Sequence, residues 1–257
     1  MRLLRGLIWT AQALFVALWT AFWILAALAI CTAVRSRRPG LFLARRVWAP
    51  GILQAIFVRL EVVGLAEQEL SGPCFFAVNH QSWVDIPVLF AALPVPVLFV
   101  AKRELGRVPF LGWFLKGMGM VLVDRADRKA AVRSVGAAAE RLRQGWSLLS
   151  FPEGTRSVDG RVQRFKTAAF AAAVEAGAPV VPIALAGAGR ILPRGSLRNS
   201  PGTIRVAVGG PIPAAGLDRH ELAGRAQQAV ESLLDTLHDE VAAGSPAAAR
   251  SSLLEAN

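Results

Sequence analysis

The sequence predicts a layered α/β domain preceded by a membrane-embedding unit of two helices. From residue 60 onward, short apolar runs alternate with segments of helical periodicity, which is the pattern of a layered α/β domain. Before that point, residues 6–34 contain no charged side chain, and about 20 apolar residues suffice to cross a bilayer. The expected division is residues 1–63 for the N-terminal membrane-embedding helices, 64–243 for the α/β domain and 244–257 for a flexible tail.

The composition points toward a membrane. The 257 residues are 54% hydrophobic, with a mean hydropathy of +0.44 and a formal net charge of +11. A basic surplus suits either nucleic acid or an anionic lipid surface, and the apolar composition favours the lipid surface and argues against nucleic acid. Both cysteines lie in apolar runs without a CxxC or Cys/His cluster, so we expect neither a disulfide framework nor a metal site.

The uncharged N-terminal segment is expected to form one helix at the membrane. Trp9, Trp19 and Trp23 are suited to the interface between lipid and water. Basic residues flank the segment on both sides, which leaves its orientation open and fits a re-entrant or hairpin insertion as well as a full span. A cleaved signal peptide is the rival interpretation, but the apolar run is longer than the 7–15 residues of an ordinary signal core.

A second, amphipathic helix is predicted from Leu41 to Val63. Trp48 suits the headgroup level, and Pro50-Gly51 is expected to kink or split the helix. Together the two segments predict a membrane-embedding unit without a second full span.

The α/β domain is expected to contain six strands and three main helices. The candidate strands are Cys74–Val78, Val97–Ala101, Met120–Val123, Ser147–Phe151, Val180–Ala186 and Ile204–Val208. The candidate helices are Arg128 to Gly145, Thr167 to Ala176, and a last amphipathic helix after Pro213 that is marked by Leu222, Val230, Leu233, Leu237 and Val241.

The stretch Cys74–Pro87, CFFAVNHQSWVDIP, contains the first candidate for catalysis. Its apolar run predicts a buried strand that ends at Asn79 and His80, with Asp85 five positions after the histidine. A bend can bring the two side chains together, so that the carboxylate fixes the imidazole tautomer and leaves the other ring nitrogen as a base. The alternative is a histidine that caps a helix and an aspartate in a turn.

The other two histidines, His220 and His238, lie in the charged C-terminal helix without an apolar pocket. His238-Asp239 resembles the HD pair of metal phosphohydrolases, but the further histidines of such a site are missing. We therefore expect structural roles for both, and His80 is the remaining candidate base.

Cations follow several predicted strands at their carboxyl ends, which is the usual edge for ligands in α/β proteins. They are Lys102-Arg103, Arg125, Arg156 and Lys166. Each alone is more often a surface charge, but together they predict a phosphate pocket. In FPEGTRS, Pro152 stiffens a turn, Gly154 permits close approach of a ligand, and Glu153 faces the ligand or pairs with Arg156.

The blocks NHQSWVD and FPEGTRS together resemble the motifs of the glycerolipid acyltransferases, most closely the 1-acylglycerol-3-phosphate acyltransferases. The resemblance covers roughly Leu70 to Ala186. It implies a mixed sheet flanked by helices, with His80 and Asp85 catalytic and Lys102, Glu153 and Arg156 binding glycerol phosphate. Arg125, Gly154 and Thr155 complete the predicted substrate-binding set. The resemblance also implies that Val180-Val181-Pro182 lies near an acyl channel.

One departure from the family pattern concerns Lys166. The family often has FKxG at this point, whereas here Thr167 and Ala168 follow the lysine. The role of Lys166 is therefore left open.

The expected reaction moves a fatty acyl group from a thioester, acyl-CoA or acyl-carrier protein, to the free hydroxyl of 1-acylglycerol-3-phosphate. The product is phosphatidic acid, a precursor in phospholipid biosynthesis, and no cofactor or metal is expected. The expected partners are the membrane lipid substrate, an anionic membrane surface and, as one of the two donors, acyl-carrier protein. The expected location is the cytoplasmic face of the inner membrane.

Two alternatives to this reaction remain open. The same residues could acylate another lysolipid, such as lyso-ornithine lipid. The chain could also be a non-catalytic lipid-binding membrane protein of the same fold. A serine hydrolase is not expected, because the sequence lacks G-x-S-x-G.

Overall fold

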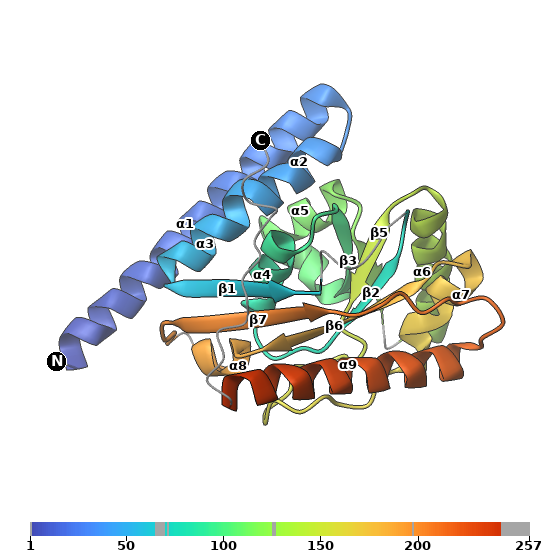
Figure 1. The fold of residues 1–257 in the computed structure, drawn as a ribbon. Helices are drawn as coiled ribbons and strands as arrows, with labels where there is room; N and C mark the ends of the chain where they lie inside the picture. The colour runs from blue at the N-terminus through green and yellow to red at the C-terminus, as the bar shows by residue number, and fades with distance from the viewer. Residues whose placement is uncertain (1, 65–69, 71, 125–126, 197, 243–257) are drawn as a thin grey trace.

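The computed structural model describes residues 2–64, 70, 72–124, 127–196 and 198–242. Its centre is a seven-stranded sheet in the order β1-β7-β6-β2-β5-β3-β4 (Figure 1). The strands are β1 Val58–Val63, β2 Phe75–Val78, β3 Val97–Lys102, β4 Val121–Val123, β5 Ser147–Ser150, β6 Val180–Ala186 and β7 Gly202–Val208. Only the β6–β7 pairing among these strands is antiparallel. The predicted mixed α/β sheet is thus confirmed.

The first strand was missed by the sequence analysis, which extended a helix from Leu41 to Val63. That helix prediction is wrong beyond Ala55, because Val58–Val63 pairs in parallel with β7. Period-two alternation decides the conformation here: Arg59 and Glu61 alternate with apolar neighbours, and Glu61 forms an ion pair of 2.7 Å with Arg205 on β7. The sheet therefore begins before the predicted domain boundary at residue 64, whereas the predicted tail, 244–257, lies outside the described residues.

The N-terminal residues form a helical hairpin. Helix α1 spans Arg2–Val34, and between Gly6 and Val34 it is long and apolar enough to cross a membrane. The chain reverses at Arg35, where φ is +54°, and returns beside α1 through α2 Arg38–Leu43, the π-helical segment η1 Ala44–Trp48 and α3 Ala49–Ala55 (Figure 1). The second predicted helix is thus three short helical segments.

Indole hydrogen bonds and close packing join the two arms of the hairpin. Trp19 Nε1 donates to the Trp48 carbonyl at 3.1 Å, and Trp48 Nε1 donates to Thr20 Oγ1 at 3.1 Å. A Cβ atom at Gly51 would lie 2.6 Å from the Trp19 ring, so a side chain at residue 51 would push the arms apart.

Helices cover both faces of the sheet. Helix α9 packs along β6 and β7 on one face, and α3 and α4 pack on the other (Figure 1). The bounds of the remaining helices are α4 Asp85–Ala92, η3 Arg103–Arg107, α5 Leu111–Gly117, α6 Arg128–Arg143, η4 Thr167–Phe170, α7 Ala171–Ala176, α8 Ala188–Ile191 and α9 Arg219–Ala242. All four residues of β2 are buried, as expected for a parallel strand covered on both faces.

The parallel strands β6, β2, β5 and β3 bring their carboxyl ends to one edge of the sheet. Asn79 and His80 follow β2, Phe151 follows β5, and β3 ends at Lys102. The sheet topology therefore gathers the segments that carry both sequence motifs.

Candidate active site

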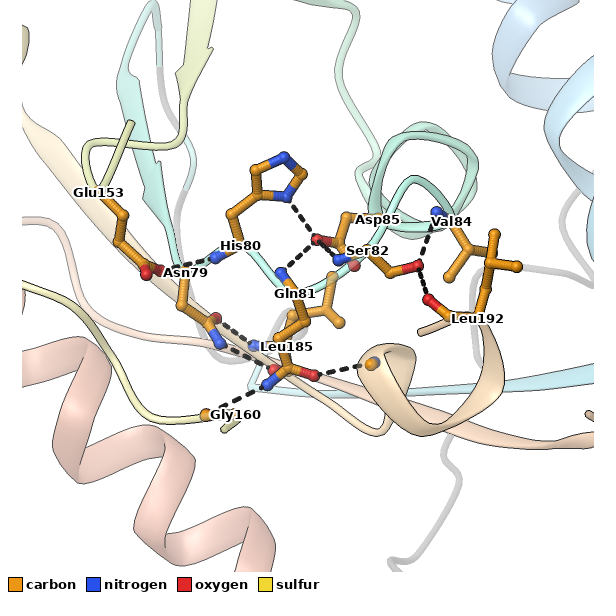
Figure 2. A network of polar contacts seen from close by, with 11 residues as sticks. Asn79, His80, Gln81, Ser82, Val84, Asp85, Glu153, Gly160, Leu185 and Leu192 are labelled. Atoms are coloured by element: carbon orange, nitrogen blue, oxygen red, sulfur yellow. Dashed lines mark hydrogen bonds and ion pairs between the residues drawn. The ribbon is translucent and has the colours of Figure 1, made fainter. Parts of the chain in front are cut away.

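His80 and Asp85 are in direct contact. His80 Nδ1 lies 2.6 Å from Asp85 Oδ2, and the same oxygen accepts the backbone N–H groups of Gln81 at 2.7 Å and Ser82 at 2.9 Å (Figure 2). Asp85 is fully buried and opens α4, where a negative charge is favoured by the helix dipole. The turn Asn79–Asp85 thus wraps around one carboxylate oxygen and provides the bend that an i, i+5 pair requires.

The imidazole is also fixed by its ring face. His80 stacks on Phe151, with ring centroids 4.0 Å apart and an interplanar angle of 16°. Since the carboxylate accepts from Nδ1–H, the neutral ring presents Nε2 as its proton acceptor. His80 lines a cavity between the helical hairpin and the α/β domain.

The backbone around His80 is held by groups from other strands and loops. The Asn79 side chain makes two hydrogen bonds to the backbone of Leu185 in β6, one to the carbonyl at 2.9 Å and one from the N–H at 2.7 Å. The backbone N–H of His80 donates to Glu153 Oε1 at 2.7 Å, and its carbonyl accepts from the Ser157 N–H at 2.7 Å. Asn79 and Ser157 both lie within the two motif blocks, but the sequence alone does not predict these backbone contacts.

The cavity has a volume of about 580 Å³ and two different ends. Near His80 it is lined by positively charged residues. Between the helical hairpin and the α/β domain its walls are apolar. Representative residues of the apolar walls are Val16, Ile24, Ile52, Phe90 and Phe114. A cavity of this form suits a ligand with an anionic group and an aliphatic chain.

Three cations, Lys102, Arg156 and Arg194, line the cavity near His80, and none of the described residues that line it is acidic. The Arg156 guanidinium lies 4.8 Å from the centroid of Trp83. Arg194 Nη1 donates to the backbone carbonyl of Arg156 at 3.2 Å. Lys102 forms an exposed ion pair of 3.1 Å with Glu104, which leaves the two arginines as the stronger candidates for an anion.

The predicted substrate-binding residues do not all lie at the cavity. Lys102, Gly154, Thr155 and Arg156 line it, whereas Glu153 does not, and Arg125 lies outside the described residues. FPEGTRS predicts that Glu153 faces the ligand or pairs with Arg156. In the structure its carboxylate instead accepts the backbone N–H groups of His80 and Gln163. Burial raises the pKa of Glu153 to about 7, and these two N–H groups act in the opposite direction.

Other sequence expectations also differ from the observed cavity. Val180-Val181-Pro182 is buried within β6 and does not line the cavity, whose apolar wall comes instead from the N-terminal hairpin together with α4 and α5. Lys166 is exposed and away from it. Arg194 was missed, because it follows α8 instead of ending a strand. The sequence offered one signal for Arg194: it is a basic residue shortly after β6, and the carboxyl end of β6 lies at the edge of the sheet that carries the site.

The remaining nucleophile and base candidates are poorly suited to the reaction. Burial raises the pKa of the Cys74 thiol to about 11, which keeps it protonated near neutral pH. His220 and His238 are exposed on α9 and lie away from the cavity.

The comparisons with known proteins agree with the motifs. The Acyltransferase family model matches residues 59–186. The chain is 34% identical over 192 residues to a 1-acyl-sn-glycerol-3-phosphate acyltransferase of Pseudomonas aeruginosa, covering 74% of this chain and 73% of that protein. The chain belongs to the acyltransferase family. This confirms the resemblance stated from the two motif blocks.

Two further relatives are named for different lipid acceptors. A lyso-ornithine lipid O-acyltransferase of Pseudomonas aeruginosa is 31% identical over 229 residues, covering 80% of this chain and 86% of the relative. A chloroplastic 1-acyl-sn-glycerol-3-phosphate acyltransferase of Brassica napus is 38% identical over 181 residues, which cover 69% of this chain and 52% of the relative. The chain spans about half the length of the chloroplastic and algal relatives it matches.

A solved structure shares the fold of this chain nearly throughout. The crystal structure of the 1-acyl-sn-glycerophosphate (LPA) acyltransferase PlsC from Thermotoga maritima matches with a TM-score of 0.80 and 26% sequence identity. The match covers 93% of this chain and 98% of that chain, so it includes most of the N-terminal hairpin as well as the α/β domain.

Proposed function

We propose that this acyltransferase moves a fatty acyl group from a thioester donor to the free hydroxyl of 1-acylglycerol-3-phosphate, giving phosphatidic acid. The observation that carries the proposal is one cavity that joins the Asp85-bound imidazole of His80, a cluster of cations and a long apolar wall. The acceptor has the matching parts: a hydroxyl, a phosphate and an acyl chain. Several relatives are named for this acceptor.

His80 is the general base of the proposed reaction. Nε2 takes the proton of the acceptor hydroxyl while its oxygen attacks the thioester carbonyl carbon. The resulting tetrahedral intermediate collapses with cleavage of the C–S bond, and the imidazolium returns the proton to the leaving thiolate. Asp85, buried against Nδ1, stabilises the imidazolium and holds the ring.

The phosphate is proposed to bind near His80, between Lys102, Arg156 and Arg194. Arginine presents a forked donor that matches two phosphate oxygens, and the cation–π contact of Arg156 over the Trp83 ring restrains the guanidinium. Gly154 and Thr155 form the adjoining loop wall, and the acyl chain extends between α1 and α3. Acyl-CoA and acyl-carrier protein both supply the required thioester, and the chemistry uses no further cofactor.

The same proposal places the protein at the membrane surface, with α1 within one leaflet. Trp9 Nε1 donates to the Asn199 carbonyl at 3.0 Å, and Gln12 Nε2 donates to the Ala55 carbonyl at 2.9 Å. Near its other end, α1 packs on α5, where Leu28 lies against Gly117. A helix bound to the rest of the protein along its length cannot cross a bilayer without drawing polar surface into the hydrocarbon.

The outer face of α1 supports this location. Its large apolar side chains are exposed, with Leu18 at 62% and Phe22 at 60%, and basic residues flank the helix in the sequence. Such a face suits burial at the boundary between headgroups and acyl chains. Because the thioester donors are cytosolic, we propose the cytoplasmic face of the inner membrane.

Replacing Leu18 and Phe22 together with glutamate is expected to lower binding to anionic phospholipid vesicles at least tenfold, because two charges would enter the interface. Vesicle flotation measures the bound fraction. Thr236→Glu, at an exposed position on α9, is the matched control and should bind almost as the wild type does. Equal binding of the double variant would contradict the assigned membrane face.

The test of the proposed reaction is an assay of the purified protein with three acceptors and both donors. The acceptors are lysophosphatidate, lyso-ornithine lipid and lysophosphatidylcholine, each paired with acyl-CoA and with acyl-carrier protein. We expect the highest kcat/KM with lysophosphatidate, because the cations match a phosphate that carries up to two negative charges. A higher kcat/KM with another acceptor would overturn the assignment.

Lyso-ornithine lipid is the second candidate acceptor. The alignment with the lyso-ornithine lipid O-acyltransferase covers 86% of that protein, more than the 73% for the glycerolipid enzyme of the same organism. Its headgroup carries an ammonium and a carboxylate, so a cavity with three cations and no acidic side chain among its described lining residues fits it less well than a phosphate. The acceptor assay separates the two candidates. A protein that binds lipids without catalysis would show no transfer to any acceptor.

A further inference from the structure

The FPEGTRS loop holds both backbone polar groups of His80. Glu153 accepts the N–H of His80 at 2.7 Å (Figure 2). The N–H of Ser157, four residues further along the same loop, donates to the His80 carbonyl at 2.7 Å. His80 lies two residues beyond Val78, the last residue of β2, where the pairing with neighbouring strands ends. The loop therefore provides the hydrogen bonds that the sheet no longer supplies at this residue.

The Glu153 carboxylate is committed to the backbone on both sides. Oε1 accepts from His80, and Oε2 accepts from the N–H of Gln163 at 3.2 Å. The residue is 3% exposed, and the next three residues of the loop line the cavity while Glu153 does not. Its oxygens are therefore directed behind the cavity wall, away from the site of a substrate.

We propose that Glu153 is a positioning residue that fixes the backbone of His80 and does not bind the acceptor. This inference rests on the proposed acyl transfer for its kinetic part. The imidazole is constrained at its edge by Asp85, at its face by Phe151 and, through the backbone, by Glu153. Small displacements matter, because proton transfer needs Nε2 within hydrogen-bond distance of the hydroxyl.

A carboxylate is required here because two donors approach two different oxygens. A glutamine has nearly the same shape but offers one oxygen and one NH₂ group, so either His80 or Gln163 would face a donor in place of an acceptor. The Glu153→Gln variant therefore disturbs the backbone contact while it keeps the volume of the side chain. Glu153→Asp keeps the carboxyl group and its two oxygens but withdraws them by one methylene group.

The decisive measurement is made on the substrate-free protein. In Glu153→Gln, we expect the imidazole NMR signals of His80 to shift, whereas those of His220 and His238, exposed on α9, stay in place. A residue that acted only on the acceptor would leave the His80 signals unchanged without substrate. This measurement holds even if the acyl-transfer proposal fails, so the two failures are distinguishable.

The kinetic measurement uses lysophosphatidate with acyl-CoA. We expect Glu153→Gln to lower kcat at least tenfold with the KM for both substrates within about twofold, and Glu153→Asp to lower kcat by a smaller factor. Glu175→Gln on α7, away from the cavity, is the control and should match the wild type. Circular dichroism checks folding, and Glu153→Asp replaces Glu153→Gln if the latter does not fold.

Two results would overturn the proposal. One is a KM for lysophosphatidate that rises fivefold or more while the His80 signals of the substrate-free protein stay unchanged, since Glu153 would then bind the acceptor. The other is an unchanged kcat together with unchanged His80 signals, since the contact would then have no effect on the imidazole.

Discussion

Replacing His80 with alanine is expected to lower kcat for acyl transfer by about a thousandfold, within the range of 10²–10⁴ for loss of a general base. The variant keeps the cavity and its cations, so the KM for lysophosphatidate should change little. Steady-state kinetics with acyl-CoA measures both constants. We expect no other side chain to replace His80 as the base, because no other described histidine lines the cavity.

Asp85→Asn should also lower kcat, but by a smaller factor, on the order of a hundredfold. The asparagine oxygen can still accept the N–H groups of Gln81 and Ser82, but it no longer stabilises an imidazolium. His220→Ala, at an exposed position on α9, is the matched control for both variants. If His80→Ala retained more than a tenth of wild-type kcat while folded and membrane-bound, His80 would not be the base.

Replacing Arg156 with alanine is expected to raise the KM for lysophosphatidate by about tenfold to a hundredfold, because a charge-assisted hydrogen bond contributes roughly 1.5–3 kcal/mol. The effect on kcat should be smaller, since the arginine binds the headgroup in both the ground and transition states. Arg156→Lys should recover only part of the loss, because lysine lacks the planar fork that stacks on Trp83.

The other cations give graded expectations for the same assay. Lys102→Ala should raise the KM less than Arg156→Ala does, because Lys102 already pairs with Glu104 in an exposed position. Arg133→Ala, an exposed cation on α6, is the control and should leave the KM unchanged. An unchanged KM in both Lys102→Ala and Arg156→Ala would contradict a phosphate headgroup as the group bound at these residues.

The helical hairpin was predictable only in part. The length and composition of residues 6–34 predict α1, and Pro50-Gly51 predicts an interruption in the second segment. The segment after Ala55 was assigned to a helix because its apolar content resembles that of the preceding residues. The alternation around Arg59 and Glu61 favours a strand, but six residues are too few to outweigh a long helical neighbour until β7 supplies the pairing partner.

The candidate site was also predictable only in part. The five-residue interval between His80 and Asp85 predicted that a bend could join them, and the structure has that bend. The direction of Glu153 was not predictable from FPEGTRS, because a carboxylate beside a cavity can point into it or behind it. That choice depends on where the His80 and Gln163 N–H groups lie, and they come from separate segments of the chain.

By itself, the sequence determined the chemical groups available, the apolar character of α1 and the family to which the chain belongs. Short-range patterns suffice for these, because periodicity and motif spacing are local properties of the chain. Only the tertiary structure decided that Arg194 joins Arg156, that the hairpin supplies the apolar wall, and that Glu153 contacts the backbone of His80. Each of these contacts joins segments distant in sequence, so its geometry depends on how the sheet and the hairpin bring those segments together.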